Sequence, residues 1–259
     1  MARELRRLLI EPGRLPVEGR QLALEQGERH YLGRVLRLRP GERFALCDGT
    51  GRLWTALLTD GGAVLEQPAA EPLQRQPCPT PRLTLAVAMP RRDGEVMARM
   101  ACELGVDGLL PLQAERSVGD KLRPDRLTAI LREAAEQCER LWLPELLPLQ
   151  SAAALLGVAP AGVGLLATTR AAGVPLLDVA LAQSQGNAMD RLTGGVTLAI
   201  GPEGGWSPAE QAQAQQAGWQ AVSLGSSILR VSTAAVAGAA ALVRWRLGLT
   251  CPSCSWPSP

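Results

Sequence analysis

Three glycines gather directly after an apolar run in the second half of the chain. Residues 198–206 read LAIGPEGGW. Glycine lets a backbone turn sharply and approach a ligand without a Cβ atom in the way. The spacing matches neither the phosphate-binding P-loop nor the GxGxxG dinucleotide fingerprint. Because Glu203 would repel a phosphate, the segment predicts a cradle for an uncharged or cationic ligand, although a ligand-free strand-to-helix connection explains the glycines equally well.

A second segment, 224–235, reads LGSSILRVSTAA and also follows an apolar run. It opens a predicted helix from about 232 to 246 that is rich in alanine and glycine, and such small side chains allow close packing. Arg230 is a single charge between the apolar pair 228–229 and the helix start. A buried arginine there would need a polar partner, so Arg230 is a candidate functional residue.

The elements that position these two segments form an α/β pattern. Apolar runs of strand length occur at 82–88, 108–112, 163–168, 196–200 and 221–224. Helical spacing separates the runs: Val96, Met97, Met100 and Leu104 form one apolar face, and residues 125–140 form a second helix with Leu127, Ile130, Leu131, Ala134 and Cys138 on one side. Such alternation predicts a parallel sheet with helices on both faces. Ligands of such sheets bind beyond the carboxyl ends of the strands, where both segments lie.

The glycine segment also carries a helix start. Ser207 is suited to the N-cap, Pro208 to the first helical position, and Glu210 completes a capping box. The predicted helix ends near Gly218.

A proline-rich stretch divides the chain. Residues 67–81 contain five prolines and little hydrophobic periodicity, so we predict a linker between a domain at 1–70 and a domain at 82–248. The first domain reads as a small β-barrel: 44–47 and 53–58 form a hairpin around the Asp48-Gly49 turn, and 30–37 is one or two helical turns. The tail, 249–259, is rich in proline and serine and is predicted to be disordered.

Basic residues are unevenly distributed. The formal net charge is only +2, but residues 1–43 hold ten arginines against six glutamates, an excess of four positive charges, with His30 beside them. This clustering favours an RNA-binding face in the first domain. Of the 27 basic residues only Lys121 is a lysine, for which codon bias is a sufficient explanation.

Other features exclude several classes of protein. No apolar run is long enough for a transmembrane helix, and the first residues lack the apolar core of a signal peptide, so we expect a cytoplasmic protein. Four cysteines, Cys47, Cys78, Cys102 and Cys138, are expected to be reduced and buried. Cys251 and Cys254 form one CxxC without further ligands, so we expect no metal site.

Taken together, the motifs closely resemble the RsmE family of 16S rRNA uridine methyltransferases, within the SPOUT superfamily. LAIGPEGG is followed some twenty residues later by LG-x-x-ILR-x-x-TA. The matching motifs, in the family's order, are HYL-x-x-VLR at 30–37, ELGV at 103–106, ERS at 115–117 and EAAEQ-x-x-R at 133–140. The chain departs from the family pattern at Met100, Ser226, Ser227, Val231 and Ser232.

The resemblance implies a PUA-like β-barrel that binds RNA, followed by an α/β SPOUT domain with a deep trefoil knot. It also implies a homodimer, S-adenosyl-L-methionine as cofactor, and 16S rRNA of the small ribosomal subunit as partner, modified at N3 of a uridine. Carried across by motif, the cofactor-binding residues are Thr168, Gly201, Glu203, Gly204, Gly205, Leu224, Gly225, Ile228, Leu229, Arg230, Thr233 and Ala234.

Residue types suggest roles for a few side chains. Uracil N3 must lose a proton, and Arg230 could stabilise the negative charge that spreads onto the carbonyl oxygens. Glu203 is a candidate base, but equally a cofactor-positioning group. Candidate RNA contacts are His30, Arg34, Arg37, Arg91, Arg116 and Arg140.

Two alternatives stay open at this point. One is a SPOUT methyltransferase with another RNA target, such as a ribose 2′-hydroxyl. The other is a non-catalytic RNA-binding or ribosome-assembly protein.

Overall fold

The computed structural model describes residues 5–118, 122–169, 173–187 and 192–250. The predicted tail and its cysteine pair, Cys251 and Cys254, lie outside these residues. The chain divides into two compact units. The first comprises 1–78 and 132–143, and the second comprises 79–131 and 144–259.

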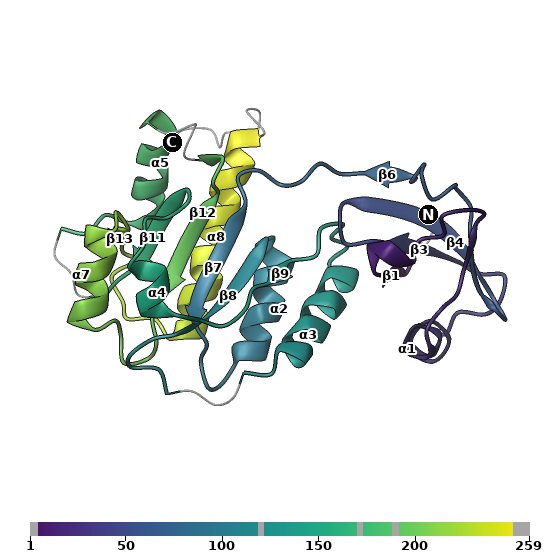
Figure 1. Cartoon of the computed structure of the whole chain (residues 1–259), viewed down its shortest axis with the longest axis horizontal. Helices are drawn as coiled ribbons and strands as arrows, with labels where there is room; N and C mark the ends of the chain where they lie inside the picture. Colours follow the sequence, from purple (N-terminus) through teal and green to yellow (C-terminus); the bar gives the residue numbers. More distant parts are fainter. Residues whose placement is uncertain (1–4, 119–121, 170–172, 188–191, 251–259) are drawn as a thin grey trace. The chain divides into compact units, whose positions relative to one another are not determined.

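The first unit contains a six-stranded mixed sheet (Figure 1). Its strands are β1 (Arg7–Leu9), β2 (Gln21–Leu22), β3 (Arg43–Cys47), β4 (Arg52–Thr59), β5 (Gly62–Leu65) and β6 (Gln74–Arg75). The order is β1-β3-β4-β5-β2, with β6 on β4, and only β1 and β3 pair in parallel. The predicted hairpin is confirmed as β3 and β4, with Gly49 at φ +70° in the turn. Phe44, Leu46 and Trp54 are fully buried at the centre of the core of this unit.

Short helical turns complete this unit. A 3-10 turn, η1, spans Pro12–Arg14, helix α1 spans Gln26–His30, and a π-helical turn, η2, spans Tyr31–Val35. These last two replace the helical turns predicted at 30–37. Arg37 follows with φ +58°, a left-handed conformation that is unusual for a residue with a side chain.

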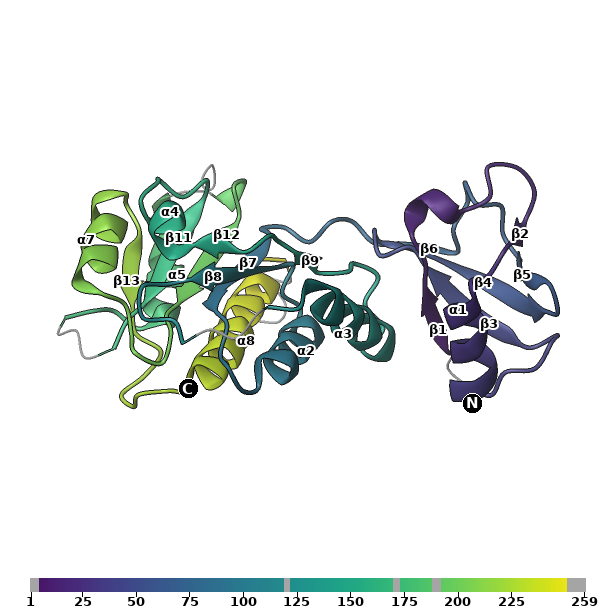
Figure 2. The ribbon, with the colours of Figure 1, turned by 60° about the horizontal axis from the view of Figure 1, so that its bottom comes forward.

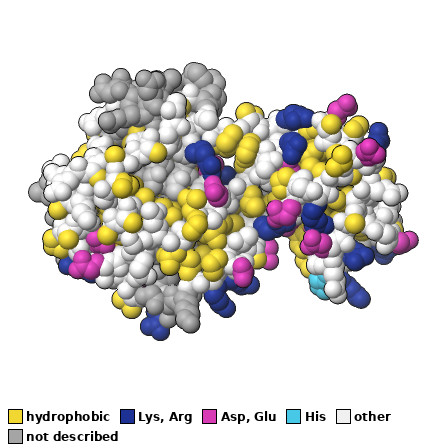
Figure 3. Space-filling view, viewed as in Figure 1, with side chains coloured by type: hydrophobic (Ala, Val, Ile, Leu, Met, Phe, Trp, Pro, Cys, Tyr) yellow, Lys and Arg dark blue, Asp and Glu magenta, His cyan; other side chains and the backbone are white. Residues whose placement is uncertain are grey.

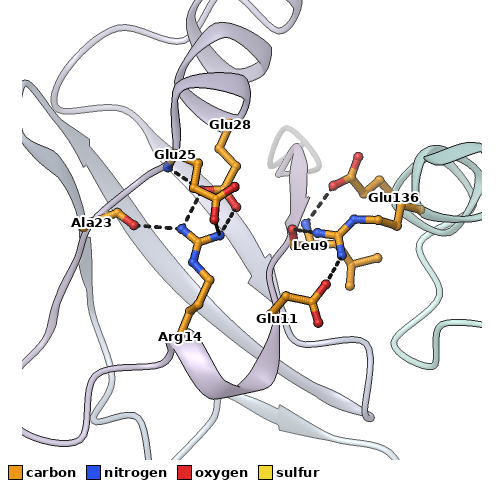
Figure 4. A network of polar contacts seen from close by, with 8 residues as sticks. Leu9, Glu11, Arg14, Ala23, Glu25, Glu28 and Glu136 are labelled. Carbon is orange, nitrogen blue, oxygen red and sulfur yellow. Dashed lines mark hydrogen bonds and ion pairs between the residues drawn. The ribbon is translucent and has the colours of Figure 1, made fainter. Parts of the chain in front are cut away.

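Polar contacts hold the second segment of this unit, 132–143, to the first strand. Arg132 binds Glu11 (2.6 Å) and the Leu9 carbonyl (2.7 Å), and Glu136 accepts a hydrogen bond from the Leu9 amide (2.7 Å) (Figure 4). Burial and the neighbouring Glu136 carboxylate raise the pKa of Tyr31 to about 12. The Tyr31 hydroxyl therefore stays protonated at neutral pH and can donate to Glu136.

The second unit has a seven-stranded sheet whose strands all pair in parallel. The strands are β7 (Leu83–Ala88), β8 (Gly108–Gln113), β9 (Glu145–Leu146), β10 (Gln150–Ser151), β11 (Val163–Ala167), β12 (Val196–Ile200) and β13 (Gln220–Val222). The order is β10-β8-β7-β12-β11-β13, with β9 also on β8. The predicted parallel sheet is thus confirmed, and its five long runs match β7, β8, β11, β12 and β13.

Helices cover both faces of this sheet, as predicted (Figure 2). Helices α4 (Ala152–Leu156) and α7 (Pro208–Gln216) pack together on one face, over a core that includes Ala86, Leu110 and Leu166. On the other face α8 (Val231–Thr250) contacts β7 and β12 between α2 (Gly94–Leu104) and α5 (Leu177–Asn187). Helix α3 (Pro124–Gln137) is divided between the two units at residue 131.

Some sequence predictions fail in detail. Helix α2 buries Met97, Ala98, Ala101 and Cys102, whereas Val96 and Met100 of the predicted apolar face are 43% and 37% exposed. Three of these four buried residues are small, which allows α8 to pack closely against the helix. Cys78 is exposed rather than buried. Leu224, predicted to end a strand, lies beyond β13 in the following loop.

A buried ion pair anchors the far end of α8. Arg246 and Asp107 are 8% and 6% exposed and form a short charge-assisted hydrogen bond. Arg246 also donates to the carbonyls of Pro81 and Gly105, and Asp107 accepts from the Leu83 amide (2.9 Å). The pair therefore joins α8 to the amino ends of β7 and β8.

We expect Arg246→Met to lower the free energy of unfolding by about 3–5 kcal/mol, because it leaves the Asp107 carboxylate buried without its cation. Chemical denaturation monitored by circular dichroism measures the loss. Arg99→Met is the matched control, since the ion pair of Arg99 with Glu103 is exposed and is worth less than about 1 kcal/mol. Equal losses in the two variants would contradict the role given to the buried pair.

Candidate active site at the carboxyl ends of three strands

The carboxyl ends of β11, β12 and β13 lie side by side, because these strands are parallel neighbours. The loops that follow them line one cavity of about 600 Å³. This volume lies within the range of pockets that hold small molecules or cofactors. The cavity therefore lies where the sequence predicted the site, beyond the ends of the strands that precede residues 201 and 225.

Trp206 shapes the loop after β12. Its indole Nε1 donates to the Ala167 carbonyl at the end of β11 (2.9 Å), and the side chain is only 5% exposed. A Cβ atom at Gly201 would lie 3.0 Å from the indole ring, so the loop passes the ring where glycine fits without strain. Gly205 has φ +69° and donates to the Pro202 carbonyl (2.8 Å), which closes the turn.

The predicted helix start after this loop is confirmed. Ser207 is the N-cap of α7, Pro208 lies in the first turn, and Ser207 and Glu210 form the capping box. The Ser207 amide donates to Glu210 Oε2 (2.8 Å), and the Glu210 amide donates to Ser207 Oγ (3.2 Å). The capping box therefore sets the direction in which the chain leaves the glycine loop.

The loop after β13 presents backbone and apolar groups to the cavity. Gly225 has φ +136°, and its amide donates to Ser223 Oγ (3.3 Å). The amides of residues 226–229 make no hydrogen bond to any other residue that the structure describes. Ile228 is 60% exposed and lines the cavity, so its apolar surface is open to a ligand.

Three charged side chains line the cavity: Arg116, Glu203 and Arg230. All three are exposed, so Arg230 does not need the polar partner that a buried arginine would require. Its guanidinium makes no hydrogen bond or ion pair within the described part of the chain. Arg116 differs, because its Nη1 donates to the Gly204 carbonyl (3.1 Å).

The structure brings most of the predicted cofactor residues together. Those lining the cavity are Thr168, Gly201, Glu203, Gly204, Gly205, Leu224, Gly225, Ile228, Leu229, Arg230 and Ala234. Thr233 is exposed on α8 and does not line the cavity, because the first turn of the helix directs it elsewhere.

The predicted RNA contacts are dispersed. Arg116 lines the cavity, and Arg91 is exposed elsewhere in the second unit. In the first unit His30, Arg34 and Arg37 are exposed, and Arg140 is half-buried. Figure 3 shows basic side chains, coloured dark blue, scattered among acidic and apolar ones.

Several lining residues were not among the predicted site residues. They include Ala167, Thr169, Trp206, Gln211, Ser223, Ser226 and Ser227. Trp206 lies inside the glycine motif, which was a usable signal. Gln211 reaches the cavity from the first turns of α7, where its Nε2 donates to the Trp206 carbonyl (3.3 Å), and no local pattern indicates this.

The described residues contain neither a cluster of metal ligands nor a membrane-spanning helix. No group of three or more His, Cys, Asp or Glu side chains is placed to hold a metal ion there. Nor does that part of the chain contain a helix that is long and apolar enough to cross a membrane.

Comparison with known proteins identifies both units. A family model described as an RNA methyltransferase domain matches residues 76–243, and a model described as an RNA methyltransferase PUA domain matches residues 24–63. The fold is therefore an N-terminal PUA domain with a C-terminal methyltransferase domain of mixed α/β structure.

Individual relatives agree with these family models. A ribosomal RNA small subunit methyltransferase E from Synechocystis is 39% identical over 74% of this chain and 62% of its own length. One from Mycobacterium bovis is 31% identical over 82% of each chain. The crystal structure of the enzyme of that name from Neisseria gonorrhoeae, bound to S-adenosyl methionine, has a TM-score of 0.73 at 27% identity, covering 92% of this chain and 97% of that one. The chain thus belongs to the RNA methyltransferases, in the family of ribosomal RNA small subunit methyltransferase E.

Proposed function

We propose that the chain transfers a methyl group from S-adenosyl-L-methionine to N3 of a specific uridine in 16S rRNA. The observation that carries the proposal is the single cavity formed by the glycine loop after β12 and the Leu224–Arg230 loop after β13. The membership in the small subunit methyltransferase E family supports the reaction and the substrate class.

The residues of the cavity fit S-adenosyl-L-methionine. Leu224, Ile228 and Leu229 supply apolar surface for an adenine ring, and the amides of residues 226–229 are available as donors. Glu203 supplies negative charge for a cationic ligand. The cofactor, when bound, supplies an electrophilic methyl group on a sulfonium.

The protein's own task is to prepare the uracil. N3 must lose its proton, and negative charge then spreads onto the two flanking carbonyl oxygens. Arg230 lies at the cavity with its guanidinium free of described partners, so it can stabilise this charge. Glu203 is exposed at the same cavity and is the candidate to accept the proton or to position the cofactor. Holding the base in line with the methyl donor supplies further acceleration.

The first domain, 1–70, is proposed to bind the RNA, and the second, 82–248, to hold the reaction. Arg34 and Arg37 are exposed beside His30 and form no described ion pair, whereas Arg14, Arg43 and Arg52 of the same unit are paired with carboxylates. Unpaired arginines are available for phosphate. Arg91, Arg116 and Arg140 are proposed as further contacts within the small subunit.

We also propose that the protein forms a homodimer. We further propose that its catalytic domain contains a trefoil knot and that the protein is located in the cytoplasm. Exposed apolar side chains on three adjacent helices support the dimer: Met100 of α2, Val179 of α5 and Leu247 of α8. Sedimentation equilibrium measures the oligomeric state.

The decisive experiment is methyl transfer from labelled S-adenosyl-L-methionine to small ribosomal subunits that lack the modification, followed by nucleoside mass spectrometry. N3-methyluridine is the expected product. A methylated ribose would point to the other RNA target, and failure to bind the cofactor would indicate a non-catalytic RNA-binding protein.

Arg230→Ala should lower the methyl-transfer rate by roughly 10²–10³-fold, the typical effect of removing a preorganised group that stabilises transition-state charge. The Kd for the cofactor, measured by calorimetry, should change little. Arg99→Ala is the control, because Arg99 is an exposed arginine on α2 that does not line the cavity. A full rate in Arg230→Ala with normal cofactor binding would refute the catalytic role.

Gly201→Ala should weaken cofactor binding by about tenfold and lower the free energy of unfolding by about 1–3 kcal/mol, because its Cβ would lie 3.0 Å from the Trp206 ring and force the ring to shift. Calorimetric titration and thermal unfolding measure both effects. Gly248→Ala adds the same methyl group in open space on α8, so it should leave cofactor binding unchanged. Equal behaviour of the two variants would show that the loop tolerates a side chain.

Arg34→Ala combined with Arg37→Ala should reduce the salt dependence of RNA binding. Each lost phosphate contact on a single strand reduces the magnitude of the slope of the log binding constant against log salt concentration by about 0.7. The slope of the double variant should therefore be smaller in magnitude by about 1.4. Fluorescence anisotropy at several salt concentrations measures the slope. Arg43→Ala, whose side chain is paired with Glu66, should keep the wild-type slope.

A further inference from the structure

The Glu210 carboxylate accepts one hydrogen bond more than the capping box of α7 requires. It lies in the first turn of α7, is 4% exposed and does not line the cavity. No described residue forms an ion pair with it. Its carboxylate is instead stabilised by backbone amides, and a buried carboxylate placed in this way is costly to disturb.

The two carboxylate oxygens of Glu210 bind two different loops. Oε2 accepts from the Ser207 amide (2.8 Å), which is the contact of a capping box. Oε1 accepts from the amide of Glu115 (2.9 Å), which lies beyond the end of β8. One side chain therefore joins the loop after β12 to the loop after β8, 95 residues earlier in the chain.

The turn that Glu210 holds carries Arg116. Ser117 closes this turn: its amide donates to the Ala114 carbonyl (3.1 Å), and its Oγ accepts from the Ala114 amide (3.0 Å). Arg116 then lies against the glycine loop, where its Nη1 donates to the Gly204 carbonyl (3.1 Å). A Cβ atom at Gly204 would lie 3.0 Å from Arg116 Cβ, so the Arg116 side chain packs directly on the Gly204 backbone.

Arg116 is consequently fixed at the cavity while most of its donors remain open. Only one of its guanidinium nitrogens has a partner among the described residues. The planar fork of arginine binds a phosphate oxygen pair with strict geometry, so its position must be set before the RNA arrives. A turn that is already ordered reduces the entropy lost on binding.

We propose that Glu210 is a positioning residue for the RNA substrate and that it acts through Arg116. This inference rests on the proposed function, because it assumes that the cavity receives a nucleotide of an RNA. By fixing the Glu115 amide, Glu210 holds the Arg116 guanidinium where it meets a phosphate next to the target base.

Glu210→Gln tests the proposal with little change in size. The amide has one acceptor oxygen, so its NH₂ group must face the amide of either Ser207 or Glu115. We expect the KM for unmodified small subunits to rise by roughly tenfold, the effect of losing one hydrogen bond to a charged group. The kcat and the Kd for the cofactor should stay within about twofold of the wild type.

Ser207→Ala is the matched control within the same capping box. It removes the oxygen that accepts from the Glu210 amide (3.2 Å) but keeps both bonds to the Glu210 carboxylate. Both variants should lower the melting temperature, because both weaken the cap. Only Glu210→Gln should raise the KM for RNA, which separates positioning from helix stability.

A double-mutant cycle with Arg116→Ala shows whether the effect passes through that arginine. Arg116→Ala alone should raise the KM for RNA at least as much as Glu210→Gln. In the Arg116→Ala background, Glu210→Gln should then add less than about twofold, because the group that it positions is absent. An unchanged KM in Glu210→Gln, or a full further effect in that background, would overturn the proposal.

Direct RNA binding distinguishes failure of this inference from failure of the proposed function. Anisotropy titrations with a labelled single-stranded RNA oligonucleotide measure RNA affinity without any reaction. They compare the wild type with the Glu210→Gln, Ser207→Ala and Arg116→Ala variants and with the double variant. If the wild type binds this RNA but methylates nothing, the proposed reaction fails and the cycle still decides the role of Glu210. If the wild type has no affinity for RNA, both proposals fail.

Discussion

The buried pair of Arg246 and Asp107 determines where the longest helix can lie. It fixes the far end of α8 to the amino ends of β7 and β8. The helix then passes so close to β12 that a Cβ atom at Gly238 would lie 2.4 Å from the Leu198 side chain. Its first turn follows directly on the loop that carries Arg230. The Arg246–Asp107 ion pair lies at one end of the sheet, and Gly238 lets α8 pack closely against its middle. Together they set the position of the first turn of α8 at the other end, where the site lies.

The site itself follows from the direction of the strands. Because β11, β12 and β13 pair in parallel, the three loops that follow them lie at one edge of the sheet. This arrangement requires no contact between the loops themselves. Side-chain bonds then fix the loops to one another. Trp206 joins the glycine loop to the end of β11, and Glu210 joins it to the turn after β8. The strand topology therefore sets where the cavity lies, and the buried side chains of Trp206 and Glu210 fix the loops that line it.

Local patterns predicted what depends on local physics. Strand-length apolar runs located the main strands, and the Ser207 and Glu210 spacing located a helix start that the structure confirms. Contacts between distant segments could not be read in this way. The inward face of α2 follows from its packing on α8, and the exposure of Arg230 follows from the path of its loop. The second bond of Glu210 has no signal in the sequence, because Glu115 is 95 residues away.

The composition of the first unit has a consequence for how the protein is made. Residues 132–143 belong to this unit, where Arg132 and Glu136 bind Leu9 of β1. A nascent chain emerging from the ribosome therefore cannot complete its first unit until part of the second has already been synthesised. The two units mature as interleaved segments of one chain, and a gene fragment that stops at residue 78 encodes an incomplete first unit.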